Sequence, residues 1–417
     1  MTSGQGGPPS DAPVEPVRVA HLTTIALSLR YLLFPQLAAV RDLPDGEVLG
    51  ISAPGPEVEG LERDGIRHIA LASSTRGMNV WADVRSAWEL WRVLRRERVD
   101  ILHTHNPKPG LYGRVVGRLA RVPIVVNTNH GVYATENDKL LRQLVVLGLE
   151  AVAARFSDAE LIQNPEDFER LTRLRVNRMS RTWLLGNGID LRRFRPGAVP
   201  ASEGTARRAE IGAGDDTVVV GIVGRLVVEK GYRELFEAVR LLAARAGGDA
   251  ADGAERVKVV VIGPDDPEKA DAITADEIAA ATETGVVFLG HRDDVEAWYA
   301  AMDLFVLPSY REGFPRAAME AAASGLPIIA TDVRGCRQVV DHEITGLLVP
   351  VRDATALATA LAELVSDPAR RKTMGKAAVA RAEDHFDERR VVDLVMDTYR
   401  HVAAAKGRDD LVARLTP

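Results

Sequence analysis

The stretch Ser309-Tyr310-Arg311-Glu312-Gly313-Phe314-Pro315-Arg316-Ala317-Ala318-Met319-Glu320-Ala321 follows an apolar run and leads into a helical pattern. Pro315 suits the first turn of a helix, where its missing N–H removes no intrahelical hydrogen bond. Gly313 lets the main chain approach a ligand closely. The helix N-terminus offers free amide donors and a partial positive charge to an anion. The stretch therefore predicts a phosphate site beside two carboxylates, Glu312 and Glu320, that can accept hydrogen bonds from hydroxyls.

A second stretch, Gly224-Arg225-Leu226-Val227-Val228-Glu229-Lys230-Gly231, directly follows the apolar run 217–223. Arg225 can bind phosphate oxygens through two N–H groups, and Lys230 adds a compact positive charge. Two such residues can be ordinary helix-start cations, but together with the Glu312 stretch they suit a diphosphate. The Gly-Lys-Ser/Thr ending of a Walker loop is absent, which argues against a P-loop nucleotide site.

Apolar β-rich runs alternate with helical patterns along the whole chain, which predicts parallel, doubly wound sheets. The expected helices include 26–40, 83–98 and 139–154, and the expected strands include 17–23, 46–52, 66–71, 101–103 and 124–127. The pattern stops at Gly186-Asn187-Gly188-Ile189-Asp190 and restarts at residue 217. We therefore expect an α/β protein with two Rossmann-like domains, 18–190 and 191–385, and a ligand site between the carboxyl ends of their strands.

Composition narrows the class of protein. The chain has 417 residues, which is long enough for two domains, and its single cysteine excludes an internal disulfide. The first 17 residues are rich in Gly, Pro and Ser and predict a disordered leader. No apolar stretch reaches about 18 residues, so we expect no membrane span and a cytoplasmic location.

The charge is divided unevenly between the two halves. Residues 1–195 carry 26 Lys and Arg against 22 Asp and Glu, a net +4, and the remainder carries 27 against 37, a net −10. The arginines of the first half are either solvated helix faces or contacts for anionic lipid or an anionic acceptor. A nucleic-acid partner is not expected, because no aromatic platform accompanies them.

The two stretches carry a family resemblance. Together with Gly186–Asp190, Phe194-Arg195-Pro196, Ala330-Thr331-Asp332 and Gly346-Leu347-Leu348-Val349-Pro350, they resemble retaining glycosyltransferase family 4. In the first half, His103-Thr104-His105-Asn106-Pro107-Lys108 and Asn127-Thr128-Asn129-His130-Gly131 resemble its branch that builds bacterial surface polysaccharides and lipid-linked glycans. The resemblance implies a GT-B architecture, with a C-terminal segment, 386–417, that crosses back to the first domain.

The resemblance also implies a reaction. A sugar moves from a nucleoside diphosphate sugar, a UDP-sugar in that branch, to a hydroxyl, with retention at the anomeric carbon and without a metal or other cofactor. Arg225 and Lys230 would hold the diphosphate, and Glu320 the ribose. Glu312, together with the amides of Gly313 and Phe314, would face the sugar. His130 would contact the sugar from the first domain. The remaining donor-binding residues implied are Gly224, His291, Arg292 and Pro315.

The acceptor is not readable from the sequence, and a lipid-linked glycan at the inner membrane face or a small molecule both remain open. Many relatives carry a glycine pair after the first strand, whereas this chain has none there. We therefore expect Thr24, Ser28 and Arg30 to present side chains to the acceptor, and Lys108 to meet an acceptor phosphate. A sugar-nucleotide epimerase of the same architecture is the alternative function.

Two groups of side chains have competing interpretations. His103 and His105 could form a metal pair, but no third ligand is evident, so buried or cleft-lining histidines are favoured and no metal site is expected. Trp81, Trp88 and Trp91 predict core or interface contacts, and an acceptor platform is the minor alternative.

Overall fold

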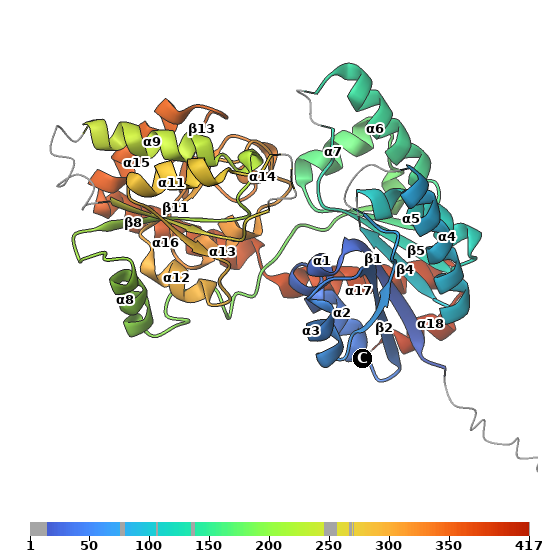
Figure 1. The fold of residues 1–417 in the computed structure, drawn as a ribbon. Helices are drawn as coiled ribbons and strands as arrows, with labels where there is room; N and C mark the ends of the chain where they lie inside the picture. The colour runs from blue at the N-terminus through green and yellow to red at the C-terminus, as the bar shows by residue number, and fades with distance from the viewer. Residues whose placement is uncertain are drawn as a thin grey trace, which may run out of the picture.

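The computed structural model describes residues 15–75, 80–105, 107–134, 138–245, 257–266, 269 and 271–416. Two parallel sheets, each covered by helices on both faces, form two domains (Figure 1). The leader predicted for residues 1–17 lies mostly outside the described residues, and the first strand begins at Val17. Among the described residues, no helix is both long enough and apolar enough to cross a bilayer.

The first sheet has seven strands in the order β3-β2-β1-β4-β5-β6-β7. Its strands are β1 (Val17–Ile25), β2 (Gly46–Ala53), β3 (Arg67–Ala70), β4 (Ile101–His105), β5 (Ile124–Asn129), β6 (Ala159–Ile162) and β7 (Thr182–Leu184). The helical elements are α1 (Ala26–Tyr31), α2 (Phe34–Arg41), α3 (Val58–Arg63), α4 (Val80–Glu97), α5 (Lys108–Leu119), α6 (Leu140–Ala153), α7 (Pro165–Arg173) and the 3-10 turn η1 (Met179–Arg181). The strand order reverses between β1 and β4, and ligand sites of such sheets lie at this reversal.

The second sheet has six strands in the order β10-β9-β8-β11-β12-β13. Its strands are β8 (Val218–Val223), β9 (Val257–Ile262), β10 (Val286–Gly290), β11 (Leu304–Leu307), β12 (Ile328–Thr331) and β13 (Gly346–Val349). The helical elements are α8 (Ala201–Glu210), η2 (Val228–Lys230), α9 (Tyr232–Arg245), α11 (Ala275–Glu283), α12 (Val295–Ala301), α13 (Arg316–Ala323), α14 (Arg334–Arg337), α15 (Ala354–Ser366) and α16 (Pro368–His385). Here the order reverses between β8 and β11, the two strands that precede the predicted donor stretches.

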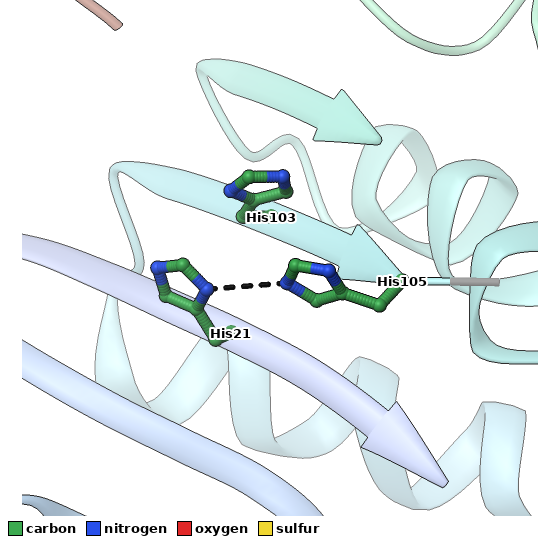
Figure 2. A group of neighbouring side chains, drawn as sticks. All are labelled: His21, His103 and His105. Carbon is green, nitrogen blue, oxygen red and sulfur yellow. Dashed lines mark hydrogen bonds between the residues drawn. The ribbon is translucent and has the colours of Figure 1, made fainter. Parts of the chain in front are cut away.

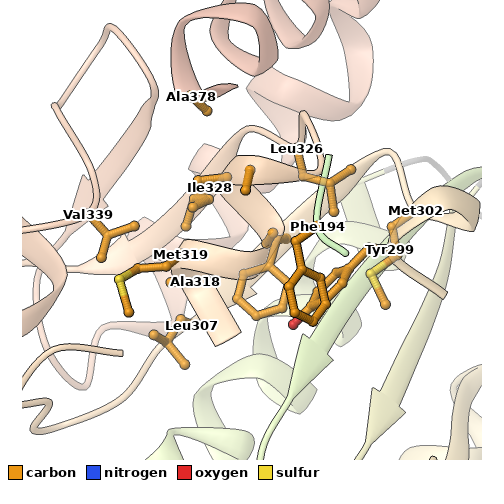
Figure 3. Packing of buried hydrophobic residues seen from close by; sticks show 14 of the residues in the cluster. Phe194, Tyr299, Met302, Leu307, Ala318, Met319, Leu326, Ile328, Val339 and Ala378 are labelled. Carbon is orange, nitrogen blue, oxygen red and sulfur yellow. The ribbon is translucent and has the colours of Figure 1, made fainter. Parts of the chain in front are cut away.

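The segment that joins the domains is anchored in the core of the second domain. Phe194 is buried and meets the Tyr299 ring edge to face, with the ring centroids 5.9 Å apart. Met302 and Leu326 lie in the same apolar cluster (Figure 3). Burying an aromatic ring at this point fixes where the linker leaves the second domain.

The helices α17 (Glu388–Ala405) and α18 (Asp409–Arg414) return to the first domain. In Figure 1, the red helix α17 lies among the blue elements of that domain. Val395 and Tyr399 of α17 share an apolar cluster with Val17, Leu37 and other residues of the first sheet and of α2. The first domain therefore has a core completed by residues from the far end of the described chain.

Two features differ from the sequence prediction. The helix expected over 26–40 is two helices, α1 and α2, because Pro35 cannot continue α1 and instead starts the next helix. On α4, Leu90 and Leu94 are buried, whereas Trp88 and Trp91 are exposed. Of the core or interface contacts predicted for these tryptophans, the core assignment is wrong, since their rings point away from the buried face that carries Leu90 and Leu94.

Candidate functional site

Lys230 and Glu312 form an ion pair although they lie 82 residues apart, with Nζ 2.6 Å from Oε1. The pair forms because β8 and β11 are neighbours, so the loops at their carboxyl ends meet. Gly231 holds the first loop in place with a φ of 75°, and a side chain there would lie 2.0 Å from the Pro308 carbonyl oxygen. Only glycine fits this position without moving the main chain. The two predicted stretches are therefore joined at one point.

Arg225 lies on the same loop and donates from Nη1 to Asp266 over 2.5 Å. Its main-chain neighbour Gly224 is fixed through its carbonyl oxygen, which accepts a hydrogen bond from Tyr232 over 2.8 Å. The guanidinium has five N–H donors, so a partly exposed Arg225 that is oriented by Asp266 can still bind an anion. The loop thus holds two cations, Arg225 and Lys230, in fixed positions.

Glu320 occupies the second turn of α13, where the hydroxyl of Tyr299 donates to its Oε2 over 3.1 Å. Burial raises the pKa of the Glu320 carboxyl, while the nearby Arg316 and the Tyr299 hydroxyl oppose that rise. The Arg316 Nε atom is 3.9 Å from Oε1. A carboxylate held in this way is a directional acceptor for a ligand hydroxyl.

The two domains meet at the loop Gly313–Phe314. A side chain built on Gly313 would lie 2.1 Å from the carbonyl oxygen of His130, so the two main chains are in direct contact. Two amide side chains of the first domain and linker hold this loop. Asn164 donates to the Gly313 carbonyl over 2.8 Å, and Asn187 donates to the Phe314 carbonyl over 3.1 Å.

A charged contact reinforces this meeting point. Arg334 of α14 pairs with Asp167 of α7 and also donates to the Val132 carbonyl. Arg337 of the same helix pairs with Glu166 over 2.7 Å. The domains are therefore docked in the structure by main-chain packing, amide hydrogen bonds and ion pairs.

His130 follows β5 and faces this meeting point with its main chain, while its ring turns towards the first sheet. The Nε2 atom lies 3.0 Å from Nδ1 of His105. Burial lowers the pKa of His130 to about 4, and a hydrogen bond with the Gln163 side chain opposes that shift. The ring is consequently neutral near pH 7.

Three histidines from β1 and β4 lie together under His130: His21, His103 and His105 (Figure 2). One nitrogen of each lies within 4.8 Å of the others, so His21 supplies the third member that the sequence prediction found absent. The contacts nevertheless describe a hydrogen-bond network. Both nitrogens of His103 have partners, Tyr399 at 2.6 Å and Thr128 at 2.7 Å, and a metal would have to displace one of them.

Two further donor-site candidates lie on the turn after β10. His291 is exposed, and its ring lies 6.5 Å from that of Tyr31 in the first domain. Arg292 donates to Glu210 of α8 over 3.0 Å and lies over the Trp298 ring. Arg292 thus joins α8 to α12 in addition to any contact with a ligand. Pro315 is the N-cap residue of α13, next to the Gly313–Phe314 loop.

The residues predicted to meet the acceptor divide into two groups. Lys108, at the start of α5, pairs with Asp83 of α4 over 2.7 Å. Arg30 pairs with Asp64 and lies over the Phe34 ring at 5.0 Å, so its guanidinium is engaged within the first domain. Thr24 and Ser28 follow β1, and both are partly exposed.

Sequence reasoning missed four residues that contact the site: His21, Asn164, Gln163 and Tyr399. His21 and Tyr399 lie 378 residues apart, and a single sequence gives no sign that they meet. Asn164 carries a readable signal, because an Asn before Pro165 predicts a helix N-cap. Its second contact, with Gly313, depends on the docking of the two domains.

Comparison with known proteins covers both domains. The family model of Glycosyl transferases group 1 matches residues 217–367, and that of Glycosyltransferase Family 4 matches residues 46–193. The UDP-Gal:alpha-D-GlcNAc-diphosphoundecaprenol alpha-1,3-galactosyltransferase of Escherichia coli is 29% identical over 83% of this chain and 86% of that protein. A D-inositol 3-phosphate glycosyltransferase of Corynebacterium glutamicum is 31% identical over 82% of this chain and 79% of that protein.

Solved structures show the same fold. The structure of Anabaena HepE in complex with UDP and glucose superposes with a TM-score of 0.73 at 20% identity, covering 92% of this chain and 99% of that one. Sucrose-phosphate synthase of Thermosynechococcus elongatus superposes with a TM-score of 0.75 at 23% identity, covering 93% and 100%. Since family models match both domains and the two-domain fold matches throughout, the chain belongs to glycosyltransferase family 4 and has the GT-B fold.

Proposed function

We propose that this protein transfers a sugar from a UDP-sugar to a hydroxyl of a lipid-linked glycan, with retention at the anomeric carbon and without a metal. The observation that carries the proposal is the Lys230–Glu312 pair. It lies at the strand-order reversal of the second sheet, beside the loop that touches His130 of the first domain. Lys230 can bind the diphosphate of a sugar nucleotide, and Glu312 can accept hydrogen bonds from the hydroxyls of its sugar.

The diphosphate is the leaving group, so its developing charge must be stabilised. Arg225 and Lys230 lie on the loop after β8, and the amides at the start of α13 offer further donors. These groups supply the positive charge without a bound cation. The acceptor hydroxyl would attack on the face of the sugar from which the diphosphate leaves. The leaving phosphate would then accept the proton of that hydroxyl.

The hydroxyls of the donor need acceptors. Glu320 would accept hydrogen bonds from the ribose hydroxyls, and Glu312, beside the amides of Gly313 and Phe314, would accept them from the sugar hydroxyls. His291 and Arg292 would lie against the base. Lys230 already neutralises Glu312, so this carboxylate is suited to orient a sugar rather than to act as a nucleophile, as a carboxylate does in retaining glycosidases.

The acceptor assignment rests on the relatives and on the surface of α6. The Escherichia coli relative is named for a diphosphoundecaprenol-linked acceptor. On α6, the outward face is apolar, and its exposed residues are Leu140, Leu141, Leu144, Val145, Leu149 and Val152. We call these six residues the α6 surface.

The inward contact of α6 combines a buried ion pair with apolar packing. Arg114 of α5 is fully buried and pairs with Glu150 of α6 and Glu160 of β6, each over 2.8 Å. This buried pair joins α6 to the domain together with Val146, Leu147 and Ala151, which pack against an apolar cluster. The six residues of the α6 surface remain exposed. A bilayer is the medium that such a face suits, and the exposed Arg142 and Arg155 nearby would attract anionic lipid.

Helix α4 packs against α5, as α6 does, and also exposes large apolar side chains. Trp81 is 83% exposed and lines an open pocket of about 700 Å³ with Val84, Arg85 and Trp88. Tryptophans favour the interface between water and lipid. Lys108 reaches the Thr75 carbonyl, and Thr75 lines the same pocket, so the start of α5 adjoins it.

Thermal unfolding in the presence of UDP-, GDP-, ADP- and dTDP-sugars tests the donor assignment. We expect stabilisation by UDP-sugars, about 2.7 kcal/mol at 100 times Kd, and its loss in Arg225→Ala and Glu320→Ala. Arg233→Ala is the matched control, because Arg233 is an exposed arginine of the same domain that pairs with Glu277. Equal stabilisation of the Arg225→Ala variant and the wild-type protein would contradict the proposed site.

A further inference from the structure

Asn164 reaches from the first domain to the main chain of the loop Gly313–Phe314. It precedes α7, and its side chain is fully buried. Its Nδ2 atom donates to the Gly313 carbonyl over 2.8 Å, and a longer bond of 3.4 Å reaches the Arg334 carbonyl. A residue of the first domain therefore holds a peptide of the second domain that lies next to Glu312.

Two glycines bring the main chains close enough for this contact. The φ of Gly131 is 140°, and a side chain there would lie 3.1 Å from the Gly313 Cα atom. Gly335 of α14 packs on Glu312 in a similar way, because a side chain there would lie 2.6 Å from the Glu312 carbonyl oxygen. Only glycine allows such close approaches of the main chain. The position of the loop is therefore set by main-chain contacts with both domains.

The orientation of the Asn164 amide group follows from its partners. Its Oδ1 atom accepts from the Glu166 amide over 2.8 Å and from the Asp167 amide over 3.4 Å, which caps α7. Helix amides can only donate and the Gly313 carbonyl can only accept, so the oxygen faces α7 and the NH2 group faces the second domain. Capping uses the oxygen alone, and a serine would cap α7 equally well. The contact of the NH2 group with Gly313 is therefore a separate function of this residue.

The same contact orients the next amide. A trans peptide is planar, and the carbonyl of one residue points opposite to the N–H of the next. Because the Gly313 carbonyl points to Asn164, the Phe314 N–H points away from it. That N–H donates to no acceptor in the described part of the chain, and Phe314 is partly exposed. The Phe314 carbonyl is held as well, by Asn187 over 3.1 Å. The protein thus offers a ligand a free donor whose direction is fixed.

We propose that Asn164 is a positioning residue that fixes the Gly313–Phe314 peptide and thereby directs the Phe314 N–H at the donor sugar. Because Asn164 belongs to the first domain, this N–H has its direction only while the two domains are docked. The ion pair between Asp167 of α7 and Arg334 of α14 holds them together at this point. The role towards the sugar rests on the proposed function, whereas the hold on the peptide does not.

A single NMR signal reports this peptide, because Gly313-Phe314 is the one Gly-Phe pair in the sequence. With carbon-13 in the glycine carbonyl and nitrogen-15 in phenylalanine, only this peptide carries both labels. In Asn164→Ser, α7 stays capped but the NH2 group is gone, so the Gly313 carbonyl carbon should shift upfield as its hydrogen bond is lost. Asp353→Ser is the matched control, because Asp353 caps α15 through the Ala356 amide, and it should leave the signal unchanged.

Ligand binding and transfer kinetics separate positioning from capping. The probe is the UDP-sugar that most stabilises the wild-type protein against thermal unfolding. It should move the Phe314 amide proton downfield in the wild-type protein, and less in Asn164→Ser. The same variant should lower kcat about fivefold, the value of one neutral hydrogen bond, with KM little changed. Asn164→Ala also loses the cap, so it should unfold at a lower temperature but lose no more of kcat.

Three results would overturn the proposal. They are an unchanged Gly313 carbonyl signal in Asn164→Ser, a wild-type kcat in that variant, and a Phe314 amide proton in the wild-type protein that does not respond to a bound UDP-sugar. If no nucleotide sugar binds, the proposed function fails, and the Gly313 carbonyl signal still decides whether Asn164 fixes the peptide.

Discussion

The carboxyl group of Glu320 is buried in the folded protein, which disfavours its charged form. Burial raises its pKa, so the folded protein binds a proton more readily than the unfolded chain does. The free energy of unfolding therefore falls as the pH rises through the interval between the two pKa values. A residue that lowers stability near neutral pH suggests a use for its charge, here the binding of ribose hydroxyls.

Replacing Glu320 with Gln should separate these two effects. Without a ligand, the Glu320→Gln variant should unfold at a higher temperature near neutral pH, because no charge is buried. With UDP, its affinity should fall about 10- to 100-fold, the value of hydrogen bonds to a charged acceptor. Thermal unfolding with and without UDP measures both.

Glu363→Gln is the matched control, because Glu363 is a half-exposed carboxylate of α15. Neither its stability nor its response to UDP should change. A Glu320→Gln variant that is stabilised by UDP as strongly as the wild-type protein would exclude Glu320 from the nucleotide site.

At the level of single residues, the sequence predicts what local chemistry determines. Lys230 and Glu312 follow apolar strands in motifs that need no knowledge of the fold, and the structure brings them together. The contacts of His21 with Tyr399 and of Asn164 with Gly313 could not be predicted in the same way. They depend on the return of α17 and on the docking of the domains, which no local pattern encodes.

Among the elements, α6 has the most unusual distribution of side chains. The six apolar residues of the α6 surface face outwards, whereas the buried Arg114–Glu150 pair and a smaller apolar set face inwards. The sequence shows an apolar-striped helix but not which face is covered, because that depends on Arg114, a residue of another helix. The same limit explains why the core interpretation of Trp88 of α4 is wrong.

Vesicle binding tests the α6 surface. Replacing both Leu141 and Leu144 with Gln should weaken binding to vesicles that contain phosphatidylglycerol on the order of 100-fold, since each side chain loses roughly 1.5 kcal/mol of burial. Co-sedimentation measures the bound fraction. Vesicles of phosphatidylcholine alone should bind the wild-type protein more weakly, because they lack the anionic charge.

A double variant of exposed apolar residues outside the α6 surface, Leu184→Gln with Ile344→Gln, should bind as the wild-type protein does. If the wild-type protein remained in the supernatant with both kinds of vesicle, the membrane role of α6 would have to be abandoned.

For the molecule as a whole, the buried histidines predict acid sensitivity. Burial lowers the pKa of His21 to about 3 and that of His130 to about 4, below the value of about 6.5 in an unfolded chain. Below pH 6.5 the unfolded chain therefore binds protons that the folded protein excludes. The free energy of unfolding should fall by about 1.4 kcal/mol per pH unit for each such histidine.

Scanning calorimetry at about pH 7.5 and about pH 5 checks this dependence. The transition that involves the first domain should move to lower temperature at the lower pH. In His21→Asn, whose amide can keep a hydrogen bond with His105, the shift should be smaller, because one titrating group is gone. An equally large shift in that variant would exclude His21 as a source of the acid sensitivity.

The return of α17 to the first domain has a consequence for how the protein is made. The helix begins about 200 residues after β7, the last strand of the sheet that it covers. During translation, the first sheet leaves the ribosome long before α17 exists, and apolar residues such as Leu37 and Val40 lack part of their cover. The apolar core of the first domain therefore remains incomplete until the second domain and α17 have been synthesised.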